Sequence, residues 1–337
     1  MKNTPRITMA AVARSAKVSS MTVSRALRDD DSIPANTRER IKKIAEKLGY
    51  RPDPMVSQLM ARLRVSRTVG TMPIAWLTAH PAENTWRGLP TSGEIYTGAR
   101  ARAEQLGYRL EAFWLRAPGM TGRRMSDILY SRGIRGIVIP PLPAGGGTID
   151  LAWERFACAT CGYSLRQPVL HRACSHQFHA ARIAWDNFAK LGKRRIGLAF
   201  SVAWDRQLDG HLLAGFLREQ HDATASRRVP PLVAPALTRE VFMRWFRQHR
   251  PDAILGAPQA RDWLRDAGAA EKCALALINI EDGDGTFRGV NHHLRELGES
   301  AVDLVAVQLS SNQSGIPAVP KVVLVECSWH EPVAALR

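Results

Sequence analysis

The stretches that decide the fold are ITMAAVARSAKVSSMTVSRAL, residues 7–27, and IPANTRERIKKIAEKLGYRPDP, residues 33–54. Thr8 and Ser19 stand where N-caps would begin two short helices separated by a brief break. Apolar residues recur at helical spacing in the second stretch, and Gly49 follows them as a residue that ends a helix. Two short helices joined by a tight turn and supported by a third form a helix-turn-helix unit.

Basic charge is concentrated in the same part of the chain. The 337 residues include 47 Lys and Arg against 31 Asp and Glu, a formal net charge of +16. Residues 1–64 hold 14 of the basic and 6 of the acidic residues, which is a net +8 in a fifth of the length. Such an excess indicates a polyanionic partner, for example nucleic acid.

These stretches resemble the DNA-binding headpiece of the lactose-repressor (LacI) family. The matching positions are Val12-Ala13, Val18-Ser19, Thr22-Val23-Ser24-Arg25, Thr37-Arg38-Glu39 and Leu48-Gly49-Tyr50-Arg51-Pro52. The chain departs from the family at Ala11, where Asp is usual, and at Lys17, where the turn usually has Gly. A left-handed residue other than Gly costs about 1–2 kcal/mol, so we expect Lys17 either to reshape the turn or to meet a phosphate.

The resemblance implies which residues contact DNA. The specificity positions fall on Ser20 and Met21, and Arg25 is the residue suited to guanine O6 and N7. Contacts that position the DNA backbone are expected from Thr8, Ser19, Thr22, Ser24, Thr37 and Tyr50.

Residues 55–63, MVSQLMARL, carry an apolar stripe at helical spacing. On pattern alone this is a linker helix packed on the core. The resemblance implies instead a hinge helix that orders on DNA, with Leu59 wedged into the minor groove beside Val56 and Met60. Pro54 replaces a polar or basic residue of the family, and Val56 replaces Ala.

From residue 72 onward, short apolar runs alternate with amphipathic helices. The expected strands are 73–79, 110–115, 136–140, 158–163, 195–200, 253–257, 274–280 and 322–327. The expected helices are 93–106, 125–132, 178–191, 212–220, 239–247 and 296–309. This alternation predicts parallel sheets with helices on both faces, and the sequence more loosely resembles the family's two-lobed, periplasmic-binding-protein-like core.

The predicted fold class is therefore α/β, with an all-α helix-turn-helix headpiece followed by a two-lobed core of parallel sheets. The expected parts are the headpiece at 1–53, a hinge helix and linker at 54–69, and an effector-binding and dimerisation core at 70–337. The expected lobes are about 70–165 plus 294–320, and 166–293 plus 321–337.

The resemblance also implies an effector in the cleft between the lobes. Residues in predicted strand-end loops that would line it are His80, Trp86, Tyr163, Trp204 and Asp205. His211 lies beside Leu212, which replaces the family's usual Arg, and Glu281 or Asp282 takes the position of its acidic residue. A carbohydrate is one expected class of effector, and packing between lobes is the alternative role for these side chains.

Other classes of chemistry find little support. Cys158 and Cys161 form a CxxC followed by Cys174, His176 and His179, but residues three apart in a strand point to opposite faces. We therefore expect no metal site and no cofactor. There is no GxSxG, HExxH or P-loop motif, so we expect no enzyme.

No apolar run approaches the ~20 residues of a membrane span, and the first residues lack the apolar segment of a signal peptide. We expect a cytoplasmic protein with no membrane partner. The predicted function is a sequence-specific transcriptional regulator, in particular a repressor, that binds a near-palindromic operator as a homodimer and responds to a small molecule. Two alternatives remain open: a regulator whose core binds no ligand, and a small-molecule-binding protein with only non-specific affinity for DNA.

Overall fold

The structure is a computed structural model, and it describes residues 8–27, 33–50, 71–143 and 147–332, with the backbone alone at Ala10, Met21 and Ser24. The chain divides into two compact units, Met1–Gly70 and Thr71–Arg337. Within the described residues, no helix is both long and apolar enough to cross a bilayer.

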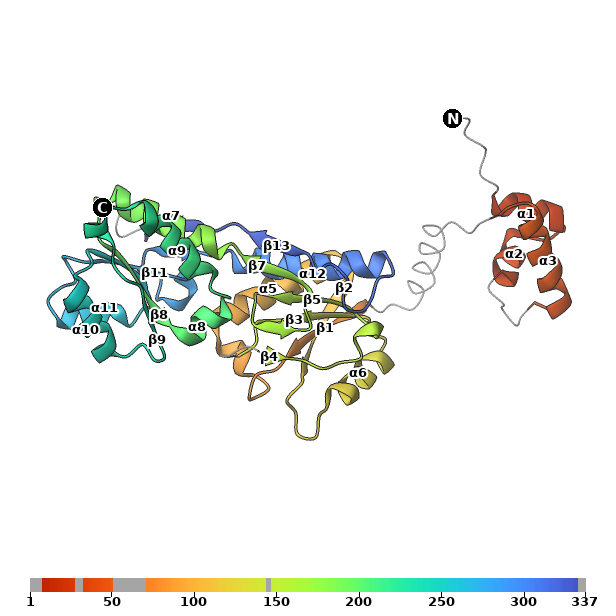
Figure 1. Cartoon of the computed structure of the whole chain (residues 1–337). Helices are drawn as coiled ribbons and strands as arrows, with labels where there is room; N and C mark the ends of the chain where they lie inside the picture. The colour runs from red at the N-terminus through yellow and green to blue at the C-terminus, as the bar shows by residue number, and fades with distance from the viewer. Residues whose placement is uncertain (1–7, 28–32, 51–70, 144–146, 333–337) are drawn as a thin grey trace, which may run out of the picture. The chain divides into compact units, whose positions relative to one another are not determined.

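The N-terminal unit has three helices in its described part: α1 (Met9–Ala16), α2 (Ser20–Ala26) and α3 (Ala35–Lys47) (Figure 1). The Thr8 hydroxyl accepts from the Ala11 amide and caps α1, and the Ser19 hydroxyl caps α2. After α3, Gly49 adopts φ +70. The Tyr50 amide then donates to the Ala45 carbonyl at 2.9 Å, as in a Schellman motif. The helix-turn-helix predicted from the sequence is therefore present.

A small apolar core holds the three helices together. Its buried members are Val12, Ala13, Ala16, Val23, Ala26, Ile41 and Ala45. The Arg40 guanidinium also donates to the Ala16 carbonyl at 3.1 Å, which ties α3 to the end of α1. Since α2 buries Val23 and Ala26 against this core, its opposite face is left exposed.

The second unit contains two six-stranded sheets. The first has the order β13-β7-β5-β3-β1-β2, and all of its neighbouring strands are parallel. Its strands are β1 (Met72–Thr78), β2 (Tyr108–Trp114), β3 (Gly136–Ile139), β5 (Ala157–Cys161), β7 (His171–Ser175) and β13 (Val322–Val325). Alternate residues of β1 pack against α5 (Pro90–Gln105) and α12 (Leu294–Ser310) on one face and against α6 (Gly122–Ser131) on the other (Figure 1).

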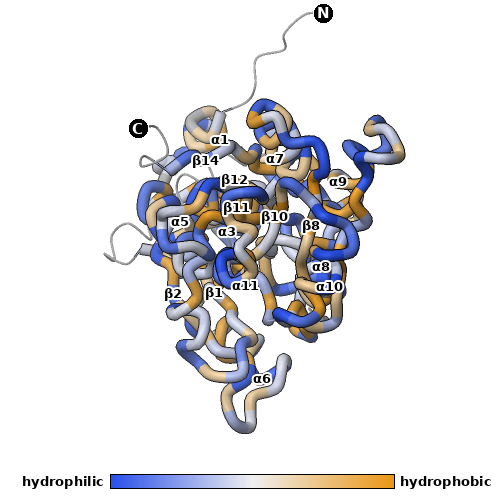
Figure 2. Tube along the Cα trace, turned by 90° about the vertical axis from the view of Figure 1, so that its left-hand side faces the viewer, coloured by the Kyte–Doolittle hydropathy of each residue, from blue (hydrophilic) through white to orange (hydrophobic). Residues whose placement is uncertain are grey.

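The second sheet has the order β14-β12-β11-β10-β8-β9, and β14 runs antiparallel to β12. Its strands are β8 (Ile196–Ser201), β9 (Leu232–Ala234), β10 (Ala253–Gly256), β11 (Ala274–Leu277), β12 (Gly289–Asn291) and β14 (Ser328–His330). The helices α7 (Gln177–Lys190) and α9 (His211–Asp222) cover one face, and α10 (Arg239–His249) and α11 (Ala260–Asp266) cover the other. Figure 2 shows the apolar run of β8 that both layers bury.

The chain crosses between the two sheets three times: between β7 and α7, between β12 and α12, and between β13 and β14. Two crossings come later than the lobe boundaries expected at 166 and 321, because β7 and β13 both belong to the first sheet. The sequence HRACS of β7 begins with two polar residues and was not recognised as a strand.

The first lobe depends on a close contact between α5 and α12. A Cβ atom on Gly98 would lie 2.0 Å from the Arg295 carbonyl oxygen, and one on Gly298 would lie 2.0 Å from the Ile95 carbonyl oxygen. Only glycine lets the two backbones approach to this distance. A helix from the first third of the chain and one near its end are thereby held in close contact.

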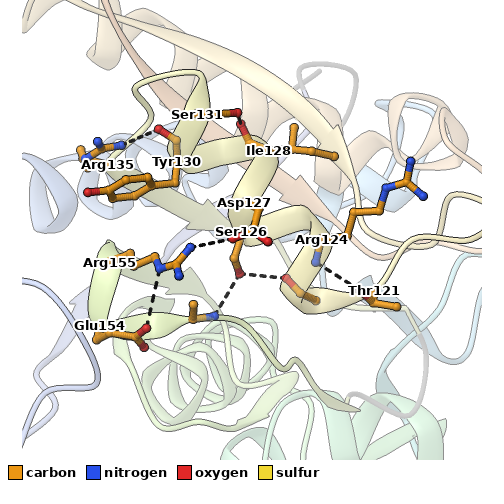
Figure 3. A network of polar contacts seen from close by, with 12 residues as sticks. Thr121, Arg124, Ser126, Asp127, Ile128, Tyr130, Ser131, Arg135, Glu154 and Arg155 are labelled. Carbon is orange, nitrogen blue, oxygen red and sulfur yellow. Dashed lines mark hydrogen bonds and ion pairs between the residues drawn. The ribbon is translucent and has the colours of Figure 1, made fainter.

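On the opposite face, polar contacts fix α6 (Figure 3). The Ser126 hydroxyl donates to the Gly122 carbonyl at 2.8 Å and accepts from the Ala152 amide at 2.9 Å. Arg155 pairs with Asp127 at 2.7 Å in the same network. The contacts with Ala152 and Arg155 join α6 to the segment that precedes β5, so the network has a structural role.

Candidate functional site

The turn between α1 and α2 keeps its left-handed geometry although Lys17 occupies it. Lys17 has φ 53 and ψ 44, and its amide donates to the Arg14 carbonyl. The Val18 amide donates to the Ala13 carbonyl at 3.1 Å, so the end of α1 repeats the motif that Gly49 forms after α3. Of the two expected outcomes at Lys17, a reshaped turn is wrong. Its exposed ammonium group adds a positive charge at the start of α2.

The second helix presents a polar surface. Ser19 accepts from the Thr22 amide at 3.0 Å, and the two hydroxyls are 2.9 Å apart. Ser20 and Arg25 are exposed, while Val23 between them is fully buried. Met21 and Ser24 lie on the same helix. Short hydroxyl side chains and one Arg on the exposed face of a second helix are the groups that read a major groove in this motif.

The remaining predicted DNA contacts are distributed around this helix or lie outside the described part of the chain. Thr8 is exposed at the start of α1, and Thr37 is half-buried in the first turn of α3. Tyr50 packs partly against the headpiece core. Val56, Leu59 and Met60 fall outside the described residues.

The second unit contains a cavity of about 430 Å³ between its two lobes. Residues that directly follow the carboxyl ends of parallel strands form much of its wall. In the first lobe these residues follow β1, β3 and β5 and include His80, Leu142 and Tyr163. In the second lobe they follow β11 and include Ile278 and Asn279. Ligands of open α/β sheets bind at this edge.

Hydrogen bonds join the lobes at the rim of the cavity. The Asn279 amide nitrogen donates to the Thr91 hydroxyl at 3.1 Å, and the Gln207 amide nitrogen donates to the Leu142 carbonyl at 3.2 Å. Each of these bonds connects a residue of one lobe with a residue of the other, so the structure shows the lobes in contact.

Several cavity residues carry unused hydrogen-bonding capacity. His80 Nε2 and Gln177 Oε1 are buried, and neither atom has a hydrogen-bond partner within the described residues. Burial and the nearby Arg116 lower the pKa of His80, so its ring is neutral at pH 7. Buried polar atoms usually have partners. These two atoms therefore mark places where a bound molecule can complete a hydrogen bond.

The cavity wall is poor in charge. Among the described residues that line it, Asp282 is the sole carboxylate, and none is Lys or Arg. Burial raises the pKa of Asp282 to about 6, with Glu281 adding to the effect. His292, which also lines the cavity, is fully buried, and this burial lowers its pKa to about 4. Its Nε2 donates to the Ile278 carbonyl at 2.8 Å, and Nδ1 lies 3.2 Å from the Cys327 sulfur.

Four of the eight predicted effector residues line the cavity: His80, Tyr163, Trp204 and Asp282. The other four do not. Trp86 is 2% exposed and packs on Trp76 and Tyr96 inside the first lobe. The His211 ring stacks on Tyr163 at 4.4 Å, so it supports a lining residue. Asp205 and Glu281 are half-buried outside the cavity lining.

Further polar residues line the cavity that were not predicted from the sequence: Ser175, Gln177, Gln207, Asn279 and His292. Ser175 is the last residue of β7, which the sequence does not predict as a strand, and Gln177 follows two residues later. Asn279 was placed inside a strand predicted to end at 280, but β11 ends at Leu277. If each predicted strand had been ended before its first polar residue, Asn279 would have fallen in the loop that lines the cavity.

The sequence match to the family and to CytR lies in the headpiece, whereas structural similarity extends over nearly the whole chain. Residues 8–53 match the family described as "Bacterial regulatory proteins, lacI family". Over 48 residues the chain is 52% identical to the HTH-type transcriptional repressor CytR of Escherichia coli, which covers 14% of each protein. Over 114 residues it is 34% identical to an HTH-type transcriptional regulator of Mycobacterium tuberculosis, covering 33% of this chain and 30% of the relative. The matches thus span less than a third of these relatives.

Solved structures extend the likeness to the whole fold. The cellobiose complex of the transcriptional regulator CelR aligns with 96% of this chain and 98% of its own, with a TM-score of 0.56 and 16% identity. The lac repressor dimer bound to operator and the anti-inducer ONPF aligns over the same shares with a TM-score of 0.54 and 17% identity. A periplasmic binding protein/LacI transcriptional regulator from Alkaliphilus metalliredigens, complexed with D-xylulofuranose, covers 77% of this chain with a TM-score of 0.53 and 11% identity. At these identities the likeness concerns the fold alone. The chain thus combines a helix-turn-helix unit that matches the lacI family over residues 8–53 with a two-lobed α/β core whose fold is similar to those of the solved structures.

Proposed function

We propose that this chain is a sequence-specific transcriptional regulator of the repressor type, whose affinity for DNA is changed by a small molecule in the cavity between the lobes. The observation that carries the proposal is the combination, in one chain, of a complete helix-turn-helix unit and a two-lobed core with a lined cavity. The relatives that match this chain, over 48 and 114 residues, are themselves transcriptional regulators.

In the proposed complex α2 lies in the major groove. Arg25 is the residue suited to a bidentate contact with guanine, and Ser20 and Met21 meet neighbouring bases. Ser19 and Thr22, whose hydroxyls are already joined, contact the DNA backbone, and Lys17 adds a phosphate contact at the turn. A homodimer presents two such helices to half-sites about one helical turn apart.

The cavity wall favours an uncharged effector with an apolar face. Because no described lining residue is Lys or Arg, a phosphate or carboxylate ligand would lack a counter-charge there, which makes its burial costly. Trp204 offers a ring for stacking, while Gln177, Asn279 and Asp282 offer groups for hydroxyl or ring-nitrogen hydrogen bonds. Neutral sugars and nucleobase-like rings fit this description.

The regulation we propose is a shift between lobe arrangements. A ligand that binds one arrangement more tightly favours it, and DNA that prefers the other arrangement then binds more weakly. By linkage, DNA weakens ligand binding by the same factor. A corepressor would act with the opposite sign through the same cavity.

Selection of genomic fragments by the purified full chain, at about 150 mM salt, tests the proposal. We expect enrichment of one near-palindromic sequence, and a panel of neutral metabolites should then change the affinity for it. Enrichment without sequence preference would contradict specific regulation. If a specific operator is found but no metabolite changes the affinity for it, the proposed role of the cavity is contradicted, while specific DNA binding stands.

A further inference from the structure

The three crossings between the lobes carry an unusual set of side chains. His176 lies between β7 and α7, His292 and His293 lie between β12 and α12, and Glu326 and Cys327 lie between β13 and β14. The crossings also contact one another, since the His176 amide donates to the Val325 carbonyl at 2.9 Å. All five residues have side chains of types that can ligate a metal ion, and they lie in the segments that connect the two lobes.

Two of these crossings bring metal-ligating atoms together. His176 Nδ1 is 3.0 Å from Glu326 Oε1, and His179 Nδ1 contacts the other carboxylate oxygen, Oε2. His179 is one turn further along α7, so both rings face the same carboxylate. One ligand atom from each of the three residues, a ring nitrogen from each histidine and a carboxylate oxygen from Glu326, lies within 4.8 Å of the other two.

The partners of Glu326 are unusual for so basic a chain. Lys and Arg number 47 in the sequence, yet within the described part of the chain both ion pairs of Glu326 are with histidines. An exposed carboxylate that faces two imidazoles places a negatively charged oxygen ligand beside two nitrogen ligands.

We propose that His176, His179 and Glu326 bind a divalent transition-metal ion, with Zn²⁺ as the best match, at the junction of the two lobes. Imidazole and carboxylate suit Zn²⁺, Co²⁺ and Ni²⁺, whereas Mg²⁺ and Ca²⁺ prefer oxygen ligands alone. The ion would bind Nδ1 of each ring, and in that form the ring carries its proton on Nε2. About a third of each histidine side chain and 64% of that of Glu326 are exposed, so water can supply the remaining ligand.

This site differs from the CxxC arrangement considered in the sequence. Cys158 packs in the core on one face of the first sheet and Cys161 on the other, so the two sulfurs cannot converge on one ion. Burial also raises the pKa of Cys174 to about 11. The sequence-based expectation of no metal site concerned the cysteines, whereas His176 and His179 face Glu326, which lies 150 and 147 residues further along the chain.

A bound ion would link the crossing at 176 to the crossing at 326. Because both crossings connect the same two lobes, the link would restrict the movement of one lobe against the other. The metal site does not depend on the proposed function, since its ligands lie outside both the headpiece and the set of residues that line the cavity.

Metal titration of the tag-free, chelator-treated full chain tests the proposal. We expect one equivalent of Zn²⁺ to bind and to raise the melting temperature, and Co²⁺ to give the visible absorption of a site with nitrogen ligands. His179→Ala and Glu326→Gln should each weaken binding about tenfold or more, since loss of even an outer hydrogen bond to a ligand costs ~10–100-fold. Glu326→Gln retains the shape of the side chain and removes only its charge and one acceptor oxygen at an exposed position, so the fold should be kept.

His221→Ala is the matched control, because His221 is exposed on α9 and takes no part in the cluster. It should bind Zn²⁺ as the unmodified chain does. The proposal is overturned if the unmodified chain takes up no stoichiometric Zn²⁺. It is equally overturned if His179→Ala and Glu326→Gln bind the ion as tightly as His221→Ala.

Discussion

The headpiece and the core position their functional side chains in opposite ways. In the headpiece a cap, a left-handed turn and a second cap within residues 8–22 place the groups that we assign to DNA. In the core the cavity collects residues from 80 to 297, and each of them depends on where a distant strand or helix ends. The headpiece is thus encoded locally, and its match to CytR is strong over 48 residues. The core shares its fold with solved regulators at about 16% identity, which leaves the cavity wall free to vary.

The largest effect should come from breaking long-range packing in the core. Gly298→Ala places a methyl group 2.0 Å from the Ile95 carbonyl oxygen, so α12 and α5 must separate. We expect a loss of about 3 kcal/mol in the free energy of unfolding. Denaturant unfolding followed by tryptophan fluorescence measures this in the core alone, because all nine tryptophans follow residue 70.

Gly93→Ala is the matched control on the same helix α5. A Cβ atom there meets nothing within 4 Å, and the substitution lowers the entropy of the unfolded chain. We expect a gain of about 0.5 kcal/mol. An equal loss in both variants would mean that α5 tolerates no side chain at either position and that the close contact with α12 is not the cause.

The next effect concerns two titratable groups of the cavity whose contributions oppose each other. The pKa of His292 is about 4 in the fold against 6.5 unfolded, so its contribution to stability is present above pH 6.5 and is lost as pH falls through 4. The pKa of Asp282 is raised from 3.8 to about 6, so its contribution is present below pH 3.8 and is lost as pH rises through 6. Between pH 4 and 6 the two slopes have opposite signs and largely cancel.

Removing either group should reveal the other. From pH 7 to 4.5, Asp282→Asn should lose about 2 kcal/mol of unfolding free energy relative to the unmodified chain, because His292 then acts unopposed. His292→Asn should gain stability relative to the unmodified chain over the same interval. Unfolding at the two pH values, monitored by tryptophan fluorescence, gives both differences. Identical slopes in all three proteins would show that neither group is buried as described.

The headpiece, which is encoded locally, could be predicted from the sequence more completely than the core, which depends on contacts between distant segments. The helices of the headpiece and the left-handed residue at Gly49 could be read directly, because caps and helix-ending residues act on their own neighbours. In the core the long apolar strands such as 196–201 and the amphipathic helices were also recognisable. The sequence did not predict β7, β9, β12 and β14, since strands of three to five residues are too short to show a periodic signal.

The cavity could be predicted only in part for a related reason. His80 and Trp204 were found because they follow strands with clear ends. Trp86 was placed with them on its position in a loop, but its ring turns inward onto Trp76 and Tyr96. Whether an aromatic residue in a loop faces a cleft or its own lobe depends on the packing of distant helices, and no local pattern records it.

A smaller effect is expected at the surface of the headpiece. Arg25→Ala should weaken binding to the operator by about 2 kcal/mol, or roughly thirtyfold, if Arg25 contacts a base edge. Arg14→Ala is the control, since Arg14 is equally exposed but lies on α1. Binding isotherms on operator and on scrambled DNA separate the two kinds of contact. A loss for Arg25→Ala that is the same on both DNAs would make it a phosphate contact.

The smallest expected effect is on the stability of the headpiece and concerns its left-handed turn at Lys17. Lys17 and Gly49 end two helices with the same motif, but only Lys17 has a side chain in a conformation that costs about 1–2 kcal/mol. Lys17→Gly removes this cost, although the greater freedom of glycine in the unfolded chain offsets part of the gain. We expect a net stabilisation of the headpiece of about 1 kcal/mol, seen as slower hydrogen exchange of the amides of α1 and α3.

Lys17→Ala separates backbone strain from charge. It loses the ammonium group as Lys17→Gly does, but it keeps a Cβ atom in the left-handed conformation, so its headpiece should exchange no more slowly than the unmodified one. Both variants should bind operator and scrambled DNA more weakly by the same factor, since a phosphate contact carries no sequence information. Slower exchange in both variants would assign the instability to repulsion among the basic residues of the headpiece. Slower exchange in Lys17→Gly alone would show that this chain retains a strained turn where its charge serves DNA binding.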